Sequence, residues 1–132
     1  MAITSYLYQF IVAIIVFLVV DLLWLGVIAK DLYAKYIGDF LRTPPNWAAA
    51  IVFYILFVIG LIIFAIAPAI REGSLSKAII YGALFGFFTY MTYELTNYAV
   101  IKNWPLDIVI IDIVWGVVLA TTVAAVTYLV VS

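Results

Sequence analysis

The sequence predicts an all-α polytopic membrane protein, with four transmembrane helices in a compact bundle and a short amphipathic helix between the first and second. Composition is the first observation, because 70% of the 132 residues are hydrophobic and only 10% are charged, whereas soluble domains carry about 25% charged residues. The second observation is that the apolar residues form four runs long enough to cross a bilayer, which takes about 20 helical residues. The whole chain, residues 1–132, is therefore expected to form one transmembrane domain.

The four runs cover about residues 6–29, 47–70, 77–101 and 106–131. Helices are expected throughout, because no alternating strand pattern is present and lipid offers backbone groups no other hydrogen-bond partner. After the first run, apolar residues recur at helical spacing from Leu32 to Leu41. This spacing predicts a short amphipathic helix on the membrane surface. Tight turns are expected at residues 71–74 and 102–105.

Basic residues are unequally distributed between the two ends of the predicted bundle. The first and third loops carry the four that are expected to face lipid headgroups: Lys30, Lys35, Arg42 and Lys102. The opposite end carries two, at positions 71 and 77. The positive-inside rule therefore favours cytoplasmic first and third loops and termini outside the cytoplasm. Trp47 and Trp104 lie at the more basic end, where an aromatic belt is expected.

Three acidic residues lie inside apolar runs, where ionisable groups are costly and often functional. Counted from the loops at 1.5 Å per helical residue, Asp21, Glu94 and Asp112 all fall about 12–14 Å below the same membrane face. Three helices thus each offer one carboxyl group to one layer, and no Lys, Arg or His lies in the interior of the runs to neutralise them. Because neighbouring carboxylates in a low dielectric do not all ionise, at least one is expected to hold a proton near neutral pH.

Polar and aromatic side chains near the acids complete a predicted site for protons, cations or a cationic small molecule. In two of the runs an Asp is followed three residues later by a Trp, which places the indole on the face of the acid, where it is available for cation–π contact. The neighbouring residues of this site are Trp24, Tyr90, Tyr93, Thr96, Asn97 and Trp115. Gly82 and Gly86 form a small-xxx-small pair that is expected to let another helix pack closely. The alternative is structural: the acids hold the bundle together through hydrogen bonds of about 1 kcal/mol each.

Residue types that the sequence lacks weaken several function classes. Without cysteine or histidine there is no disulfide, thiolate or imidazole chemistry, and no basic cluster suits a nucleic acid. No Gly-rich phosphate loop or Gly-x-Ser-x-Gly motif occurs. We therefore expect no cofactor and name no catalytic residue. Whether a metal binds stays open, and the sequence favours a non-enzymatic role without deciding it.

Short segments in and beside the predicted spans carry a resemblance to other proteins. They are DLLWLG at residues 21–26, PNW at 45–47, YELTN at 93–97, NWP at 103–105 and DIVWG at 112–116. Over nearly the whole chain the sequence resembles a family of small bacterial predicted membrane proteins, classed as a domain of unknown function. The resemblance implies four spans in the bacterial inner membrane, with periplasmic termini under the charge rule, and it implies no activity.

Three functions are compatible with these observations. The first is a small transporter or channel whose acid layer carries protons or cations. The second is a lipid-modifying or lipid-binding protein that holds a headgroup at its basic end. The third is a structural subunit of a larger membrane complex. Membrane lipid is the expected partner, a homo-oligomer or a larger complex stays open, and nucleic acid is not expected.

Overall fold

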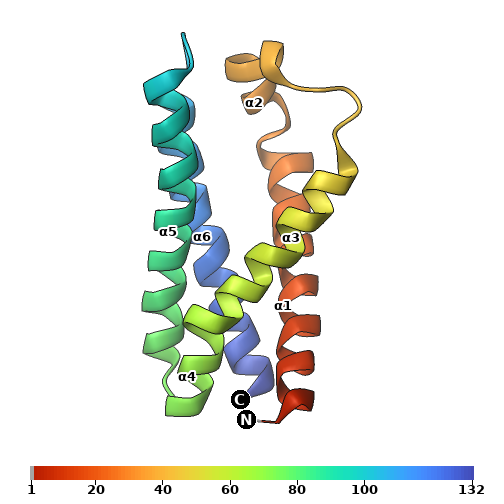
Figure 1. The fold of residues 1–132 in the computed structure, drawn as a ribbon, viewed down its shortest axis with the longest axis vertical. Helices are drawn as coiled ribbons and strands as arrows, with labels where there is room; N and C mark the ends of the chain where they lie inside the picture. The colour runs from red at the N-terminus through yellow and green to blue at the C-terminus, as the bar shows by residue number, and fades with distance from the viewer. Residues whose placement is uncertain (1) are drawn as a thin grey trace.

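The computed structural model describes residues 2–132, and nearly all of them are helical (Figure 1). The predicted single domain also includes Met1, which lies outside the described residues. The long helical stretches are α1 (Ile3–Leu23) with the π-helical turn η1 (Trp24–Ile28), α3 (Trp47–Leu61) with the π-helical turn η3 (Ile62–Ile66) and α4 (Ala67–Glu72), α5 (Leu75–Val100), and α6 (Leu106–Val131). Residues 2–132 contain no strand, so the all-α prediction is confirmed.

Of the described helical stretches, three are long and apolar enough to cross a membrane: Ile3–Ile28, Trp47–Glu72 and Leu106–Val131. Helix α5 has the same length as α6, 26 residues. Its tyrosines, threonines, Glu94 and Asn97 make it less apolar than the other three stretches. Both chain ends and the α4–α5 turn lie at one end of the molecule, whereas α2 and the α5–α6 turn lie at the other (Figure 1).

Local sequence explains where the helices begin and end. Asn46 caps α3, since its side-chain oxygen accepts a hydrogen bond from the Ala49 N–H at 3.2 Å. Gly73 ends α4 in the left-handed conformation, with φ of 62°, which glycine adopts without steric cost. Ser74 then caps α5 by accepting the Lys77 N–H at 3.1 Å. Helices α4 and α5 are therefore joined by a tight turn at the predicted position.

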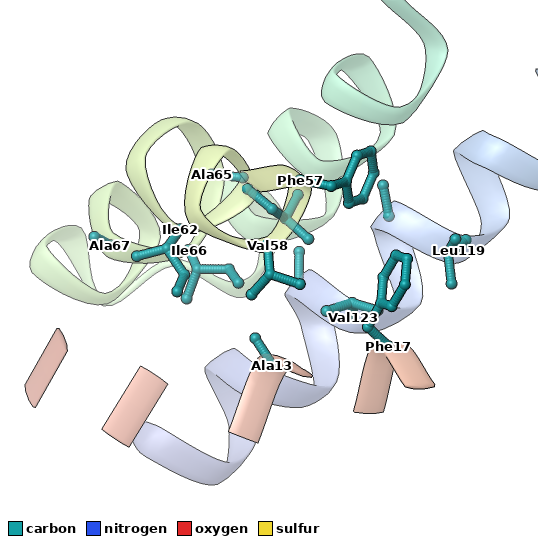
Figure 2. Packing of buried hydrophobic residues seen from close by; sticks show 13 residues of the cluster. Ala13, Phe17, Phe57, Val58, Ile62, Ala65, Ile66, Ala67, Leu119 and Val123 are labelled. Carbon is teal, nitrogen blue, oxygen red and sulfur yellow. The ribbon is translucent and has the colours of Figure 1, made fainter. Parts of the chain in front are cut away.

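The main hydrophobic core lies in the half of the molecule that contains the chain ends. Figure 2 shows Phe17 of α1 facing Val58 of α3 and Leu119 and Val123 of α6, with Ile66 of η3 beside them. All five side chains are almost completely buried. Helices α1, α3 and α6 are therefore held together on this side of the three acids.

Helices α5 and α6 pack closely because glycines face the contact. A Cβ at Gly82 would lie 2.8 Å from the Cβ of Ala124, and a Cβ at Gly86 would overlap the carbonyl oxygen of Gly116. A Cβ at Gly116 would in turn overlap the ring of Tyr90. The predicted small-xxx-small pair thus lies against α6, and Gly116 leaves the space that positions the Tyr90 ring.

Helix α2 (Lys30–Ile37), continued by a 3₁₀ turn η2 (Gly38–Phe40), occupies the position of the predicted amphipathic helix. Its apolar side chains pack on the end of the bundle. Leu32, Tyr33, Tyr36 and Ile37 lie against a small cluster formed by Trp104, Ile108 and Val109. The start of α6 and the turn before it therefore cover part of the apolar face of α2, and its position at a membrane surface stays a prediction.

The two tryptophans expected in an aromatic belt differ in their surroundings. Trp47 is 58% exposed, in keeping with that expectation, whereas Trp104 is only 8% exposed. Trp104 is covered by α2 and by the Phe40 ring, whose centroid lies 5.5 Å away. The belt position predicted for Trp104 is therefore corrected: its indole points into the protein.

Candidate functional site

The three acids line one cavity of about 470 Å³ between the main core and the cluster around Trp104. Asp21 of α1, Glu94 of α5 and Asp112 of α6 are 8%, 2% and 9% exposed. Much of the remaining wall is aromatic: Trp24, Tyr33, Phe53, Tyr54, Tyr90, Tyr93, Trp104 and Trp115. The structure thus brings the three predicted carboxyl groups, with four of their predicted aromatic neighbours, to one cavity.

The two Asp-x-x-Trp segments pair across the α1–α6 contact. The Trp115 indole donates to Asp21 Oδ1 at 3.3 Å, and the two indoles, Trp24 and Trp115, stack with centroids 4.4 Å apart and planes at 8°. Helices α1 and α6 run in opposite directions (Figure 1), so the tryptophan that follows each Asp lies at the level of the other Asp. Each indole shares the cavity with its own acid, as the spacing predicts, and the Trp115 indole also donates to the acid of the neighbouring helix. The stacking also covers one face of each indole, which limits the predicted cation–π role to the other face.

Asp112 is reached from α2 through a tyrosine. The Tyr33 hydroxyl donates to Asp112 Oδ1 at 2.9 Å and accepts the Trp24 indole N–H at 3.1 Å. Burial raises the pKa of the Tyr33 hydroxyl, and the negative charge of Asp112 adds to the shift. The hydroxyl therefore stays protonated and serves as the donor to the carboxyl group.

Glu94 is held by a tryptophan from the α5–α6 turn. The Trp104 indole donates to Glu94 Oε1 at 2.9 Å. Glu94 and Asp112 line the same cavity, so carboxyl groups from α5 and α6 face one space.

Lys30 of α2 also lines the cavity, although its side chain is largely exposed. From the sequence, Lys30 was expected to face lipid headgroups, and no positive charge was expected near the acids. Sequence reasoning likewise missed Tyr33, Tyr54 and Trp104 as cavity residues. Of these three, Tyr33 belongs to the amphipathic spacing that predicts α2. That spacing identifies an apolar face of the helix, but it does not show which surface the face covers.

The remaining predicted site residues lie apart from the cavity or at its edge. Asn97 does not line it, but its side chain is hydrogen-bonded to Tyr93, which does. Thr96 is exposed on α5 and outside the cavity wall. Lys35, Arg42 and Lys102 are exposed and do not line the cavity either.

Within residues 2–132, no group of three or more Asp, Glu, His or Cys side chains is placed to hold a metal ion. The three acids share the cavity, but each is engaged by its own donor: Trp115, Trp104 or Tyr33. The arrangement places three carboxyl groups next to aromatic rings. Carboxyl groups exchange protons, and aromatic faces attract organic cations.

Comparison with known proteins places the chain in a family without assigning an activity. The model of a family described as "Predicted membrane protein (DUF2177)" matches residues 6–129, which include all three acids. Searches of curated proteins and of solved structures found no match. The resemblance to an uncharacterised membrane-protein family is thus confirmed, and the chain belongs to the DUF2177 family of predicted membrane proteins.

Proposed function

We propose that this chain is a small four-span transporter or channel of the bacterial inner membrane, whose acid-lined cavity binds protons and a cationic ligand. The observation that carries the proposal is the position of the acids. Three carboxyl groups from three helices line one mostly aromatic cavity. Ionisable side chains are costly to bury at such depth, so those that occur there commonly serve a function.

A fourth span is supported by the way α5 is attached to its neighbours. Short turns tie α5 to α4 at one end and to α6 at the other, and the glycine contacts hold α5 against α6 (Figure 1). Its 26 residues extend over about 39 Å, more than the hydrocarbon thickness of about 30 Å. Its acid, Glu94, faces inward. Four spans put both chain ends on one side of the membrane. The positive-inside rule, applied to the charges of the loops, favours the periplasm for that side.

The charges around the cavity favour a monovalent occupant. Three acids and one basic residue, Lys30, line the cavity. Lys30 balances one ionised acid, and burying further negative charge without a partner is expensive. Protons or a monovalent cation neutralise that charge, so the two compete. The cavity volume of about 470 Å³ lies in the range of small-molecule sites, about 300–1,000 Å³, and is large for a bare ion.

The test is binding of tetraphenylphosphonium to the full chain in lipid nanodiscs, by titration calorimetry over a pH series. We expect binding that weakens as the pH falls, because protons compete for the same charge. Asp21→Asn, Glu94→Gln and Asp112→Asn should each weaken it at least about tenfold, the equivalent of one lost charge contact. Asp107→Asn is the matched control, since Asp107 is exposed on α6 and outside the cavity.

Intrinsic fluorescence gives a second measure of binding. Three of the four tryptophans line the cavity, and the fourth, Trp47, is exposed outside it. Tetraphenylphosphonium should therefore change the emission of Trp47→Phe as much as that of the wild type. Identical, pH-independent titrations of the wild type and all three acid variants would remove the basis for the proposal.

A lipid-binding role is the second candidate, because Lys30 adds a positive charge to the cavity wall. A lipid with an anionic headgroup would use Lys30 and avoid the acids. It would therefore bind more tightly to the three acid variants and more weakly to Lys30→Met. The cation proposal expects the opposite order for tetraphenylphosphonium.

A further inference from the structure

The acid cavity continues into a second pocket between α3 and α5. This pocket, of about 360 Å³, is lined by Phe53, Thr89, Tyr90, Tyr93 and Asp112. All of these except Thr89 also line the acid cavity. The two spaces therefore meet at Asp112, and the second pocket adds an almost wholly apolar wall beside a carboxyl group.

The second pocket exists because α3 diverges from α5. Phe57 of α3 is in ring contact with Phe85 and Tyr90 of α5, with centroids 5.1 and 6.1 Å apart. Beyond Phe57, towards α2, helix α3 leans away from α5 (Figure 1). Phe53, one turn further along, is 45% exposed, and Tyr93 on the facing helix is 57% exposed. The pocket is therefore open on its outer side.

The opening lies at the depth of lipid chains. Thr89 and Tyr93 precede the end of α5 at Val100 by 11 and 7 residues, or about 16 and 10 Å along the helix. Half the hydrocarbon layer is about 15 Å thick. In the four-span arrangement proposed above, the opening thus faces acyl chains and not water.

Aromatic side chains cover parts of two other sides of the acid cavity. On the α1–α6 side, the stacked indoles of Trp24 and Trp115 separate the acids from an apolar outer groove that includes Val114. At the α2 end, Tyr33 is bonded to Asp112 and packs on the cluster around Trp104. The α3–α5 side is the one where an apolar pocket leads directly to a carboxyl group.

We propose that the ligand is a lipophilic monovalent cation that reaches the cavity sideways, from the hydrocarbon layer, between α3 and α5. Its charged group lodges against Asp112 and Glu94, and its apolar body lies against Phe53, Tyr90 and Tyr93. This inference rests on the proposed function and adds the ligand class and the route. The ligand must carry both a charged group and an apolar body, because the route is apolar and ends at carboxyl groups.

Single-cysteine labelling tests the route, because the chain has no cysteine of its own. Phe53→Cys is labelled with a bulky maleimide in nanodiscs, and tetraphenylphosphonium association is followed by stopped-flow tryptophan fluorescence. We expect association at least about tenfold slower than in the unlabelled variant, within the one to three decades over which on-rates vary at one interface. Val114→Cys is the matched control: Val114 is 56% exposed on the α1–α6 side, and its label should leave the rate unchanged.

A label at a third position tests the competing route, which leads from water into the cavity under α2. Leu41 lines the acid cavity at that end, and labelled Leu41→Cys should bind at nearly the unlabelled rate. If the Leu41 label slows association and the Phe53 label does not, the sideways route is wrong, while the cation site stands. If unlabelled protein does not bind tetraphenylphosphonium at all, the proposed function fails together with the route.

A second probe tests the ligand class. Tetramethylammonium has the same charge with little apolar body, so it should bind at least about tenfold more weakly than tetraphenylphosphonium, given about 0.8 kcal/mol per buried CH₂. Equal affinities would overturn the requirement for an apolar body. Preferential binding of tetramethylammonium would assign the cavity to small hydrophilic cations.

Discussion

Removing the Tyr33 hydroxyl tests whether α2 is tied to the acid cavity by hydrogen bonds or only by apolar packing. In Tyr33→Phe, Asp112 loses a donor at 2.9 Å and the Trp24 indole loses its acceptor at 3.1 Å. Side-chain hydrogen bonds within membrane proteins are worth about 0.6–1.7 kcal/mol each. Loss of the two bonds together should therefore lower the free energy of unfolding by about 2 kcal/mol. Two unpaired polar groups buried in a soluble protein would cost somewhat more.

The assay is SDS-induced unfolding in mixed micelles, followed by circular dichroism, with hydrogen–deuterium exchange across α2. Tyr36→Phe is the matched control, since Tyr36 lies on the same helix and packs on the same cluster, with no side-chain hydrogen bond among those found in residues 2–132. We expect Tyr36→Phe to change stability by less than about 0.5 kcal/mol, as a surface substitution does. Faster exchange in α2 should accompany Tyr33→Phe alone. Equal losses in the two variants would refute the reasoning, because packing would then account for the position of α2.

Three further predictions concern pH, helix packing and the buried glutamate. The pKa of Tyr33 is raised by burial and then by the charge of Asp112. The Tyr33 hydroxyl therefore contributes its full stabilisation below the ordinary tyrosine pKa, and this stabilisation is lost as the pH rises above about 10. Alkaline unfolding scans should show a steeper loss of stability in the wild type than in Tyr33→Phe. Gly86→Ala places a Cβ against the backbone of α6 and should cost about 1–3 kcal/mol in SDS unfolding, whereas Gly26→Ala, which meets nothing within 4 Å, should cost nothing measurable. Trp104→Phe removes the indole donor to Glu94 and should lower the thermal midpoint; the loss should shrink in a Glu94→Gln background, and an unchanged loss would mean that the two side chains are not coupled.

Much of the fold could be predicted because it depends on one-dimensional properties. Apolar runs of spanning length predict long helices, and a fixed rise of 1.5 Å per residue predicts depth. That rule alone put Asp21, Glu94 and Asp112 in one layer, and the structure places all three on one cavity. Counting along helices works here because each acid lies only a few turns from the loop, although the π-helical turn η1 follows Asp21.

The partners of the acids could not be predicted, because they depend on helix rotation and direction. Spacing along one helix put Trp24 on the face of Asp21, but it could not show that the Trp115 indole of the antiparallel neighbour donates to that acid. Lys30 and Tyr33 reach the cavity only because α2 folds back over the bundle end. An amphipathic pattern identifies an apolar face, and it does not distinguish a protein surface from a lipid surface.

The crossed Asp-x-x-Trp pairs show where the two halves of the site differ. Antiparallel α1 and α6 give the two segments an approximate local twofold relation, in which each acid faces the indole of the other helix. The relation is broken at one step: Asp21 takes the Trp115 indole directly, whereas Tyr33 is inserted between the Trp24 indole and Asp112. The donor to Asp21 is therefore fixed in a packed helix, while the donor to Asp112 is carried by a short helix on the bundle end. If α2 moves, Asp112 loses its donor while Asp21 keeps its own, so we expect Asp112 to be the acid whose surroundings depend on the position of α2.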